Sequence, residues 1–483
     1  SCVLGSQDTA TDMAFQRIES IVAHEYFHNW SGNRVTCRDW FQLSLKEGFT
    51  VFRDSQFSSD MGSPTVKRIE DASMLRTAQF AEDAGPMAHP VRPESYMEIT
   101  NFYTLTVYEK GCEVVGMIRT LLGAELFRLG SDLYFERHDG QAVTTDDFVR
   151  AMEDASGRDL SQFRLWYEQA GTPELSVADE FDQDRKVYSI SIRQSIPETP
   201  GQTHKKPQHI PFALGLLGAD GKPLPLKLSA DEQDAPTERV LELTEANQAF
   251  EFHGLSDQPV PSLLRHFSAP VRVNYPWTRD QLRFLMNNDV DGFNRWDAGQ
   301  KLAGDVIRSL IGQGDSAQVD AELVEAYRQL LTEDALDQAL VAKMLQLPSE
   351  AYLIEISTKP EVQAIHTARE KVLNCLAGGL RAELLQCYHR NTLAGAYEVT
   401  PQAVARRSLR NTALAWLLQV GDDEARSLAL RQYAGSDNMT DRLGALRALV
   451  GSDFEADRDR TLSDFYERFK QDPQVVEQWF SVQ

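Results

Sequence analysis

The stretch His24-Glu-Tyr-Phe-His28, followed after eighteen intervening residues by Glu47, constrains this chain more tightly than any other part of its sequence. On a helix, His24 and His28 stand at positions i and i+4, so both imidazoles leave the same face with Cβ atoms roughly 5–6 Å apart. That spacing lets two ring nitrogens reach one ion at about 2.0–2.1 Å. Glu47, from a second helix, is suited to be the third ligand and leaves the fourth position open for water. We therefore predict a catalytic zinc site with one Zn²⁺ per chain.

The residues before the first histidine predict the helix that this site needs. Apolar side chains recur at helical intervals from Asp12 onward, and Thr9 or Thr11 is available as the N-cap. Glu25 follows the first histidine and cannot point straight at the same ion, but it can lean over the open position and take a proton from bound water. Because zinc lowers the pKa of that water to about 7, the predicted reaction is hydrolysis with Glu25 as general base.

An accidental occurrence of the pattern is the alternative explanation. With ten histidines in 483 residues, the pattern arises by chance on the order of once in a hundred such chains. The second glutamate makes an accident less frequent still, so the sequence favours the metal site.

The region around this pattern resembles the zinc-binding segment of the gluzincin aminopeptidases, and in particular aminopeptidase N of the bacterial type. The similar segment covers residues 24–48, and further similarity is found in residues 101–111, 134–140 and 438–443. The resemblance therefore spans nearly the whole chain. Animal relatives usually have Asn where this chain has Lys46, which favours the bacterial branch.

The resemblance implies roles for five side chains. His24, His28 and Glu47 hold the zinc ion, and Glu25 is the general base. Tyr108 donates its hydroxyl to the oxyanion of the tetrahedral intermediate, where a positioned phenol stabilises the charge that builds on the carbonyl oxygen. Without the resemblance, the pattern around Tyr108 is that of an amphipathic core residue.

Two further residues are weaker candidates, each with an ordinary alternative. Tyr103, five residues before Tyr108, either lines the same cleft or is a packing residue. Asp54 lies seven residues after Glu47 and near its helical face. It either orients a zinc histidine from behind or is a solvated helix carboxylate.

One departure from the family concerns the substrate's free ammonium group. Family members bind it through acidic residues before the zinc helix, notably the glutamate of a Gly-Ala-Met-Glu-Asn segment, and this sequence has no such segment. The chain starts at Ser1 without an initiator methionine, 23 residues before His24. We therefore expect a fragment that lacks the family's N-terminal region and extreme C-terminus, with little or no aminopeptidase activity of its own.

Composition limits the partners and the compartment. A net charge of −23, from 49 basic and 72 acidic residues, argues against nucleic acid or an anionic membrane surface as a partner. No run of eighteen or more apolar residues is present, so we expect no transmembrane segment. An odd number of cysteines without framework spacing indicates reduced thiols and a cytoplasmic protein. These cysteines are Cys2, Cys37, Cys112, Cys375 and Cys387. Peptides are the expected substrates, and a monomer is the expected state.

The predicted fold is multidomain and mainly α, with a small β domain, and 483 residues correspond to roughly three domains. Residues 1–171 are predicted to be the helical portion of a thermolysin-like zinc catalytic domain, with one helix over residues 103–122. Residues 172–269 alternate in polarity and contain an Asp220-Gly221 hairpin signal, which predicts a small β-sandwich. Residues 270–483 return to a helical period without a strict repeat, which predicts an irregular α-solenoid.

The predicted function is a zinc metallo-aminopeptidase that removes N-terminal residues from peptides by means of metal-activated water. The alternative is a noncatalytic helical scaffold or interaction protein derived from this family. A complete ligand set with a base favours the enzyme, because a scaffold has no use for these groups. A third possibility keeps the enzyme but changes its substrate, as in the related epoxide hydrolases.

Overall fold

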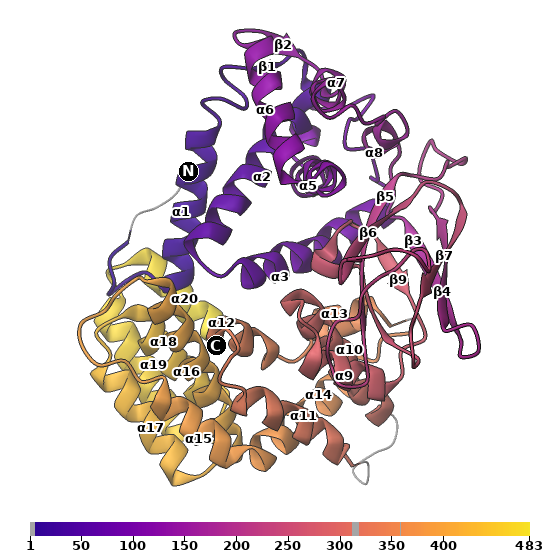
Figure 1. The fold of residues 1–483 in the computed structure, drawn as a ribbon. Coiled ribbons are helices and arrows are strands. Elements are labelled where there is room, and N and C mark those ends of the chain that lie inside the picture. Colours follow the sequence, from indigo (N-terminus) through magenta and orange to yellow (C-terminus); the bar gives the residue numbers. More distant parts are fainter. Residues whose placement is uncertain (1–4, 312–317, 358) are drawn as a thin grey trace. The chain divides into compact units, whose positions relative to one another are not determined.

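The structure is a computed structural model that describes residues 5–311, 318–357 and 359–483, so Cys2 lies outside the described residues. The chain divides into two compact units. The first unit comprises Ser1–Ile21, Met61–Val66 and Trp296–Gln483, and the second comprises Val22–Asp60 and Lys67–Arg295. Figure 1 labels most of the α-helices and strands of both units.

The part of the chain before residue 172 is mainly helical, as the sequence predicts. Its helices are α1 (Asp12–Phe27), η1 (Trp40–Gln42), α2 (Leu43–Met61), α3 (Pro64–Met74), η2 (Leu75–Gln79), α4 (Phe80–Ala84), η3 (Ile99–Phe102), η4 (Thr106–Lys110), α5 (Gly111–Leu122), α6 (Ala124–His138), α7 (Thr145–Ser156), η5 (Gln162–Arg164) and α8 (Leu165–Glu168). Two short parallel strands, β1 (Thr36–Cys37) and β2 (Ala142–Val143), pair with each other. At the start of α1, the N–H of Ala14 donates to Oγ1 of Thr11 at 3.2 Å, which makes Thr11 the N-cap.

The helix predicted over residues 103–122 differs from the structure in its first part. Tyr103 only caps η3, and the segment η4 that carries Tyr108 is a π-helix. Its defining hydrogen bond joins the N–H of Gly111 to the carbonyl of Thr106, five residues earlier. A π-turn inserts one extra residue into a helix, and such a local change leaves the apolar periodicity of the sequence almost unaltered. The prediction of a single regular helix was therefore wrong for this part.

Residues 174–274 form two antiparallel sheets. The first sheet has the order β7-β4-β3-β9 and the second the order β6-β5-β8. The strands are β3 (Glu174–Asp182), β4 (Val187–Ser195), β5 (Ile210–Leu217), β6 (Glu238–Leu243), β7 (Asn247–His253), β8 (Val260–Leu263) and β9 (Arg272–Asn274). The exception to the antiparallel pattern is β9, which pairs in parallel with β3 and lies past residue 269, the predicted end of the sandwich. Asp220-Gly221, the predicted hairpin, lies in a tight turn. In this turn the N–H of Gly218 donates to the carbonyl of Lys222 at 2.9 Å.

The apolar side chains that alternate along β4 lie on one buried face of the strand, as predicted. Tyr188, Ile190 and Ile192 are all buried and share one face of the strand. By contrast, every residue of β5 is buried, because this strand is central in its sheet and also contacts helix α5. The small β domain thereby supports the helix that follows the π-turn η4.

Among the described residues after 276, the regular elements are all helices. These helices are α9 (Arg279–Asn288), α10 (Gly292–Leu310), α11 (Ala321–Thr332), α12 (Gln338–Met344), α13 (Glu350–Glu355), α14 (Val362–Gly379), α15 (Arg381–Arg390), α16 (Pro401–Val420), α17 (Asp423–Gly435), α18 (Met439–Val450), α19 (Glu455–Phe469) and α20 (Pro473–Val482). From α13 onward successive helices pack against each other, and α16 forms the centre by contacting α12, α14, α15, α17 and α18. Among the described helices, none is both long enough and apolar enough to cross a membrane.

The start of α1 is anchored within the first unit by a buried ion pair. Arg407 of α16 is 1% exposed, and its Nε lies 2.7 Å from Oδ2 of Asp12. The hydroxyl of Tyr397 donates to Oδ1 of Asp12 at 2.6 Å, so the aspartate has a partner for each oxygen. A buried charge is tolerated when it is paired in this way.

The predicted fold class is confirmed: helices, a small β-sandwich and a helical solenoid follow one another along the chain. The domain boundaries at residues 171/172 and 269/270 stay predictions.

Candidate metal centre

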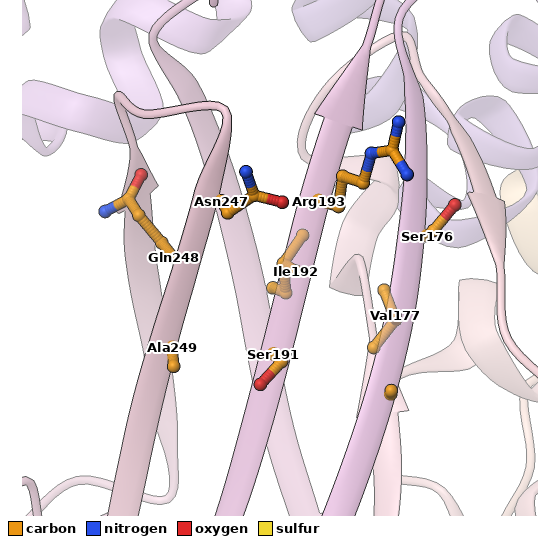
Figure 2. Close-up of a pocket in the computed structure, with 9 residues that line it drawn as sticks. Ser176, Val177, Ser191, Ile192, Arg193, Asn247, Gln248 and Ala249 are labelled. Atoms are coloured by element: carbon orange, nitrogen blue, oxygen red, sulfur yellow. The ribbon is translucent and has the colours of Figure 1, made fainter.

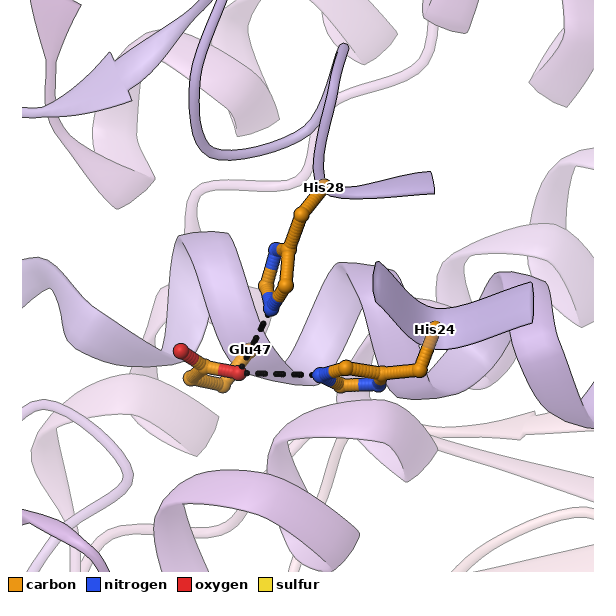
Figure 3. A group of neighbouring side chains, drawn as sticks. All are labelled: His24, His28 and Glu47. Atoms are coloured by element: carbon orange, nitrogen blue, oxygen red, sulfur yellow. Dashed lines mark hydrogen bonds and ion pairs between the residues drawn. The ribbon is translucent and has the colours of Figure 1, made fainter. Parts of the chain in front are cut away.

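His24, His28 and Glu47 lie together, as Figure 3 shows. One ligand atom from each lies within 4.8 Å of the others. In the described part of the chain, these three residues are the group of His, Cys, Asp or Glu side chains close enough together to share a metal ion. Nε2 of His24 is 3.3 Å and Nε2 of His28 is 3.1 Å from Oε2 of Glu47. Both imidazoles therefore point the same ring nitrogen at one carboxylate oxygen.

The other ring nitrogen of each histidine, Nδ1, also has a hydrogen-bond partner. Nδ1 of His24 lies 2.7 Å from Oδ2 of Asp54, which confirms that Asp54 bonds a histidine of the predicted site. Nδ1 of His28 lies 3.0 Å from the carbonyl oxygen of Ser31. A carbonyl oxygen can only accept, so Nδ1 of His28 carries the proton and its Nε2 can present a lone pair. Such partners orient the rings and make them better ligands.

Glu47 is buried, and its two oxygens have different partners. Oε2 faces the histidines, while Oε1 accepts a hydrogen bond of 2.8 Å from Nζ of Lys46. Burial by itself would raise the pKa of Glu47, but hydrogen bonds from His24, His28 and Lys46 hold it well below its usual range. The carboxylate is therefore ionised and available as a ligand at neutral pH.

The same contacts hold a proton on His24 when no cation is present. Burial would lower the pKa of His24, but the carboxylates of Asp54 and Glu47 raise it to about 9. The protonated ring occupies a place where positive charge is stabilised by two acids. Two imidazoles and a carboxylate with convergent ligand atoms are a donor set that fits Zn²⁺, and the residues present therefore fit the predicted ion.

Glu25 and Tyr108 lie beside this group. Glu25 is exposed on α1, one residue after His24. Burial raises the pKa of Tyr108, and the negative charge of Glu47, a hydrogen bond to Glu47 and the charge of Glu25 raise it further. The phenol is therefore a neutral hydrogen-bond donor, and its hydroxyl is within reach of the predicted ligand Glu47. The ring of Tyr103 is half exposed and its centroid lies 6.3 Å from that of Tyr108.

Two glycines allow Tyr108 and Glu47 to meet. Gly48 of α2 and Gly111 at the start of α5 are in direct backbone contact: a Cβ atom on Gly48 would lie 2.7 Å from the carbonyl carbon of Gly111. Because Gly48 follows Glu47 and Gly111 is three residues after Tyr108, this contact brings the two predicted site residues together. A backbone cannot give way as a flexible side chain does, so the position requires glycine.

We expect Gly48→Ala to lower the free energy of unfolding by about 1–3 kcal/mol, the usual range for overpacking. We also expect it to lower turnover, because α2 and α5 must separate. The matched control is Gly116→Ala in α5, where the nearest atoms to a Cβ are those of Phe52 at 3.9 Å. Urea denaturation and kinetics of both variants check the prediction. Equal stability of the two variants would show that the glycine contact is not required.

Four residues around the π-turn η4 were not anticipated from the sequence. Gln79, Glu82, Asp83 and Lys110 hold this turn by hydrogen bonds that join segments about 25 residues apart. No spacing rule connects such residues, so only the tertiary contacts reveal them.

A surface hollow elsewhere in the second unit is chemically different from the metal centre. It has a volume of about 400 Å³ and is lined by residues of β3, β4 and β7. Figure 2 shows these side chains. The nine residues that line it include Arg193 but no histidine, cysteine or acidic residue. It therefore offers no ligand set for a metal and no general base.

Comparison with known families identifies the class to which this fold and site belong. Residues 1–167 match the model of the Peptidase family M1 domain. Residues 171–276 match a domain of unknown function (DUF3458) with an Ig-like fold, and residues 279–483 match its companion (DUF3458_C) with ARM repeats. The three matches follow the order of helical, β and helical parts described above.

Individual proteins of known sequence or structure are similar to the whole chain. The chain is 46% identical over 484 residues to aminopeptidase N of Escherichia coli K12, and 43% identical to aminopeptidase N of Haemophilus influenzae. Both alignments cover 100% of this chain and 55% of the relative, so the chain spans about half the length of these proteins. A crystal structure of Legionella pneumophila aminopeptidase A in complex with aspartic acid is similar with a TM-score of 0.86 and 30% identity, covering 99% of this chain and 54% of that one. Over its whole length the chain is therefore similar to aminopeptidase N of the bacterial type, and its first 167 residues match the Peptidase family M1 domain.

Proposed function

We propose that the protein is a zinc metallo-aminopeptidase that hydrolyses N-terminal residues from peptides. The observation that carries this proposal is the convergence of Nε2 of His24 and Nε2 of His28 on Oε2 of Glu47, beside the exposed Glu25. The aminopeptidase activity named for the relatives supports the choice of substrate. A monomer without nucleic-acid partners, with domains over residues 1–171, 172–269 and 270–483, is part of the same proposal.

His24, His28 and Glu47 would hold the ion. Zinc in this position would supply a water of pKa about 7 and would polarise the substrate carbonyl. Asp54 keeps the His24 ring oriented, since it accepts the hydrogen bond from Nδ1. The ligands thereby remain in place while the charge at the reacting centre changes.

Glu25 and Tyr108 would carry the proton and the developing charge. Glu25 takes the proton from the attacking water and delivers it to the leaving amine, as a general base and then a general acid. Tyr108 remains protonated because of its raised pKa. Its O–H can therefore donate to the carbonyl oxygen as that atom becomes negative, an interaction that strengthens in the transition state.

Metal removal from the full-length gene product tests the proposal. We expect dialysis against a chelator to abolish hydrolysis of an aminoacyl p-nitroanilide, and one equivalent of Zn²⁺ per chain to restore it. An N-acetylated form of the same substrate distinguishes an aminopeptidase from an endopeptidase, because it has no free ammonium group. Bound zinc without turnover of any peptide substrate would favour the noncatalytic scaffold instead.

A further inference from the structure

We propose that Glu82 and Asp83 are positioning residues that hold the two ends of the π-turn η4 and thereby place the hydroxyl of Tyr108 for catalysis. This inference rests on the proposed function, because it assigns a purpose to residues that act through Tyr108.

Glu82 holds the first residue of the turn. Its Oε1 accepts hydrogen bonds from the backbone N–H of Thr106 at 2.9 Å and from Oγ1 of Thr106 at 2.5 Å. Gln79 adds a third contact, since its Nε2 donates to Oγ1 of Thr106 at 3.2 Å. The N–H groups at the start of a helix have no partner within the helix. Glu82, from a separate segment, therefore supplies the cap for the turn that carries Tyr108.

Asp83 holds the last residue of the turn. Nζ of Lys110 lies 2.7 Å from Oδ2 of Asp83, and both side chains are 1% exposed. Nζ of Lys110 also donates to the carbonyl of Gly171 at 3.0 Å, and Oγ1 of Thr172 donates to Oδ2 of Asp83 at 2.9 Å. A buried charge pair with all of these partners is costly to rearrange. Two consecutive acids of α4 thus fix Thr106 and Lys110, the first and last residues of η4.

The need for two anchors follows from the geometry of the turn. A π-turn has weaker hydrogen-bond geometry than an α-helix and persists where its surroundings stabilise it. Relaxation to an α-helix would remove one residue from the turn and rotate the preceding residues by about 100° relative to α5. Tyr108 lies between the anchors, so such a rotation would take its hydroxyl away from Glu47. Both anchors therefore oppose the same displacement.

Substitution of Glu82 provides the sharpest test, because this side chain is partly exposed whereas Asp83 is fully buried. In the full-length zinc enzyme, we expect Glu82→Ala to lower kcat by about 10–100-fold, the scale of a 1 Å misplacement of a catalytic group. KM and the zinc content should stay within twofold of the wild type. Glu82→Gln retains an oxygen at the Oε1 position and should restore most of kcat. Glu125→Ala, in an exposed part of α6, is the matched control.

A double variant with Tyr108→Phe tests whether Glu82 acts through Tyr108 or by another route. In a Tyr108→Phe protein, Glu82→Ala should cause no further loss of kcat, because both changes remove the same interaction. A loss that persists in this background, or a Glu82→Ala enzyme as active as the control, would overturn the inference. An unchanged kcat in Tyr108→Phe itself would also overturn it, since Glu82 would then have no catalytic group to position.

Crystal structures of Glu82→Ala and Glu82→Gln give a readout that needs no activity. The alanine variant should show Tyr108 withdrawn from Glu47, and an unmoved Tyr108 would contradict the inference even if the wild type hydrolysed no peptide. Absence of turnover in the wild type is in turn a failure of the proposed function alone. If Glu82→Ala does not fold, Thr106→Val removes the hydroxyl contacts only, and a several-fold loss of kcat that Thr106→Ser restores is expected in its place.

Discussion

Glu25→Gln is expected to lower kcat of the full-length gene product by about 10²–10⁴-fold, the contribution of a general base, with one zinc ion still bound per chain. Glutamine has nearly the same size as glutamate but cannot accept a proton at neutral pH. Glu25 is exposed and is not one of the three grouped ligand residues, so its loss should leave the metal in place. Steady-state kinetics and elemental analysis of the same preparation check both parts of the prediction.

A matched control comes from the same helix. Glu19→Gln removes an equal charge from α1 six residues before Glu25 and should retain full activity. A fully active Glu25→Gln enzyme would eliminate Glu25 as the base. Loss of the metal together with activity would instead make Glu25 a ligand, which its position next to His24 does not allow on one helix face.

Glu47→Ala is expected to abolish zinc binding at micromolar metal and with it all measurable turnover. Glu47 is the carboxylate on which both histidines converge, and its removal leaves two imidazoles with no acid between them. Loss of a direct ligand should exceed the 10–100-fold loss of affinity that is typical of outer partners. Competition with a fluorescent zinc chelator measures the affinity, and circular dichroism checks that the variant folds.

Asp54→Asn is the comparison for Glu47→Ala, because it should weaken zinc binding without abolishing it. Asp54 contacts His24 on the side of the ring away from Glu47, since its Oδ2 lies 2.7 Å from Nδ1 while Nε2 faces Glu47. We expect about 10–100-fold weaker zinc binding, with activity regained at saturating zinc. Equal affinities for Glu47→Ala and the wild type would exclude Glu47 as a ligand. An effect of Asp54→Asn as large as that of Glu47→Ala would mean that the two acids have exchanged roles.

Prediction from the sequence succeeded where one helical period determines the geometry. His28 directly follows the last residue of α1 and still lies one turn from His24, because its N–H donates to the carbonyl of His24 at 3.0 Å. The approach of the two rings follows from that spacing. Asp54 is about two turns after Glu47 on α2, so its approach to the same site was also foreseeable. The sandwich could be predicted for a similar reason, because period-two alternation in β4 puts three apolar residues on one face.

Prediction failed where the geometry depends on segments far apart in the chain. The π-turn that carries Tyr108 differs from a regular helix by one residue, and the hydrogen bonds that maintain it come from Glu82 and Asp83, more than 20 residues earlier. Tyr108 itself was assigned through family resemblance, since its own surroundings in the sequence suggest a core position. The close contact of Gly48 with Gly111 has no local pattern either.

The sequence by itself determined which groups are available and which of them lie one or two helical turns apart. These are two imidazoles, at His24 in α1 and at His28 directly after it, and two carboxylates, Glu47 and Asp54, on α2. Helical periodicity is a local property, so no tertiary information was needed for this part. Only the tertiary structure decided that the two helix faces meet and that a phenol from a third segment joins them. That meeting depends on backbone contact between two glycines and on buried hydrogen bonds to the π-turn, and these non-local interactions form only when the whole unit packs.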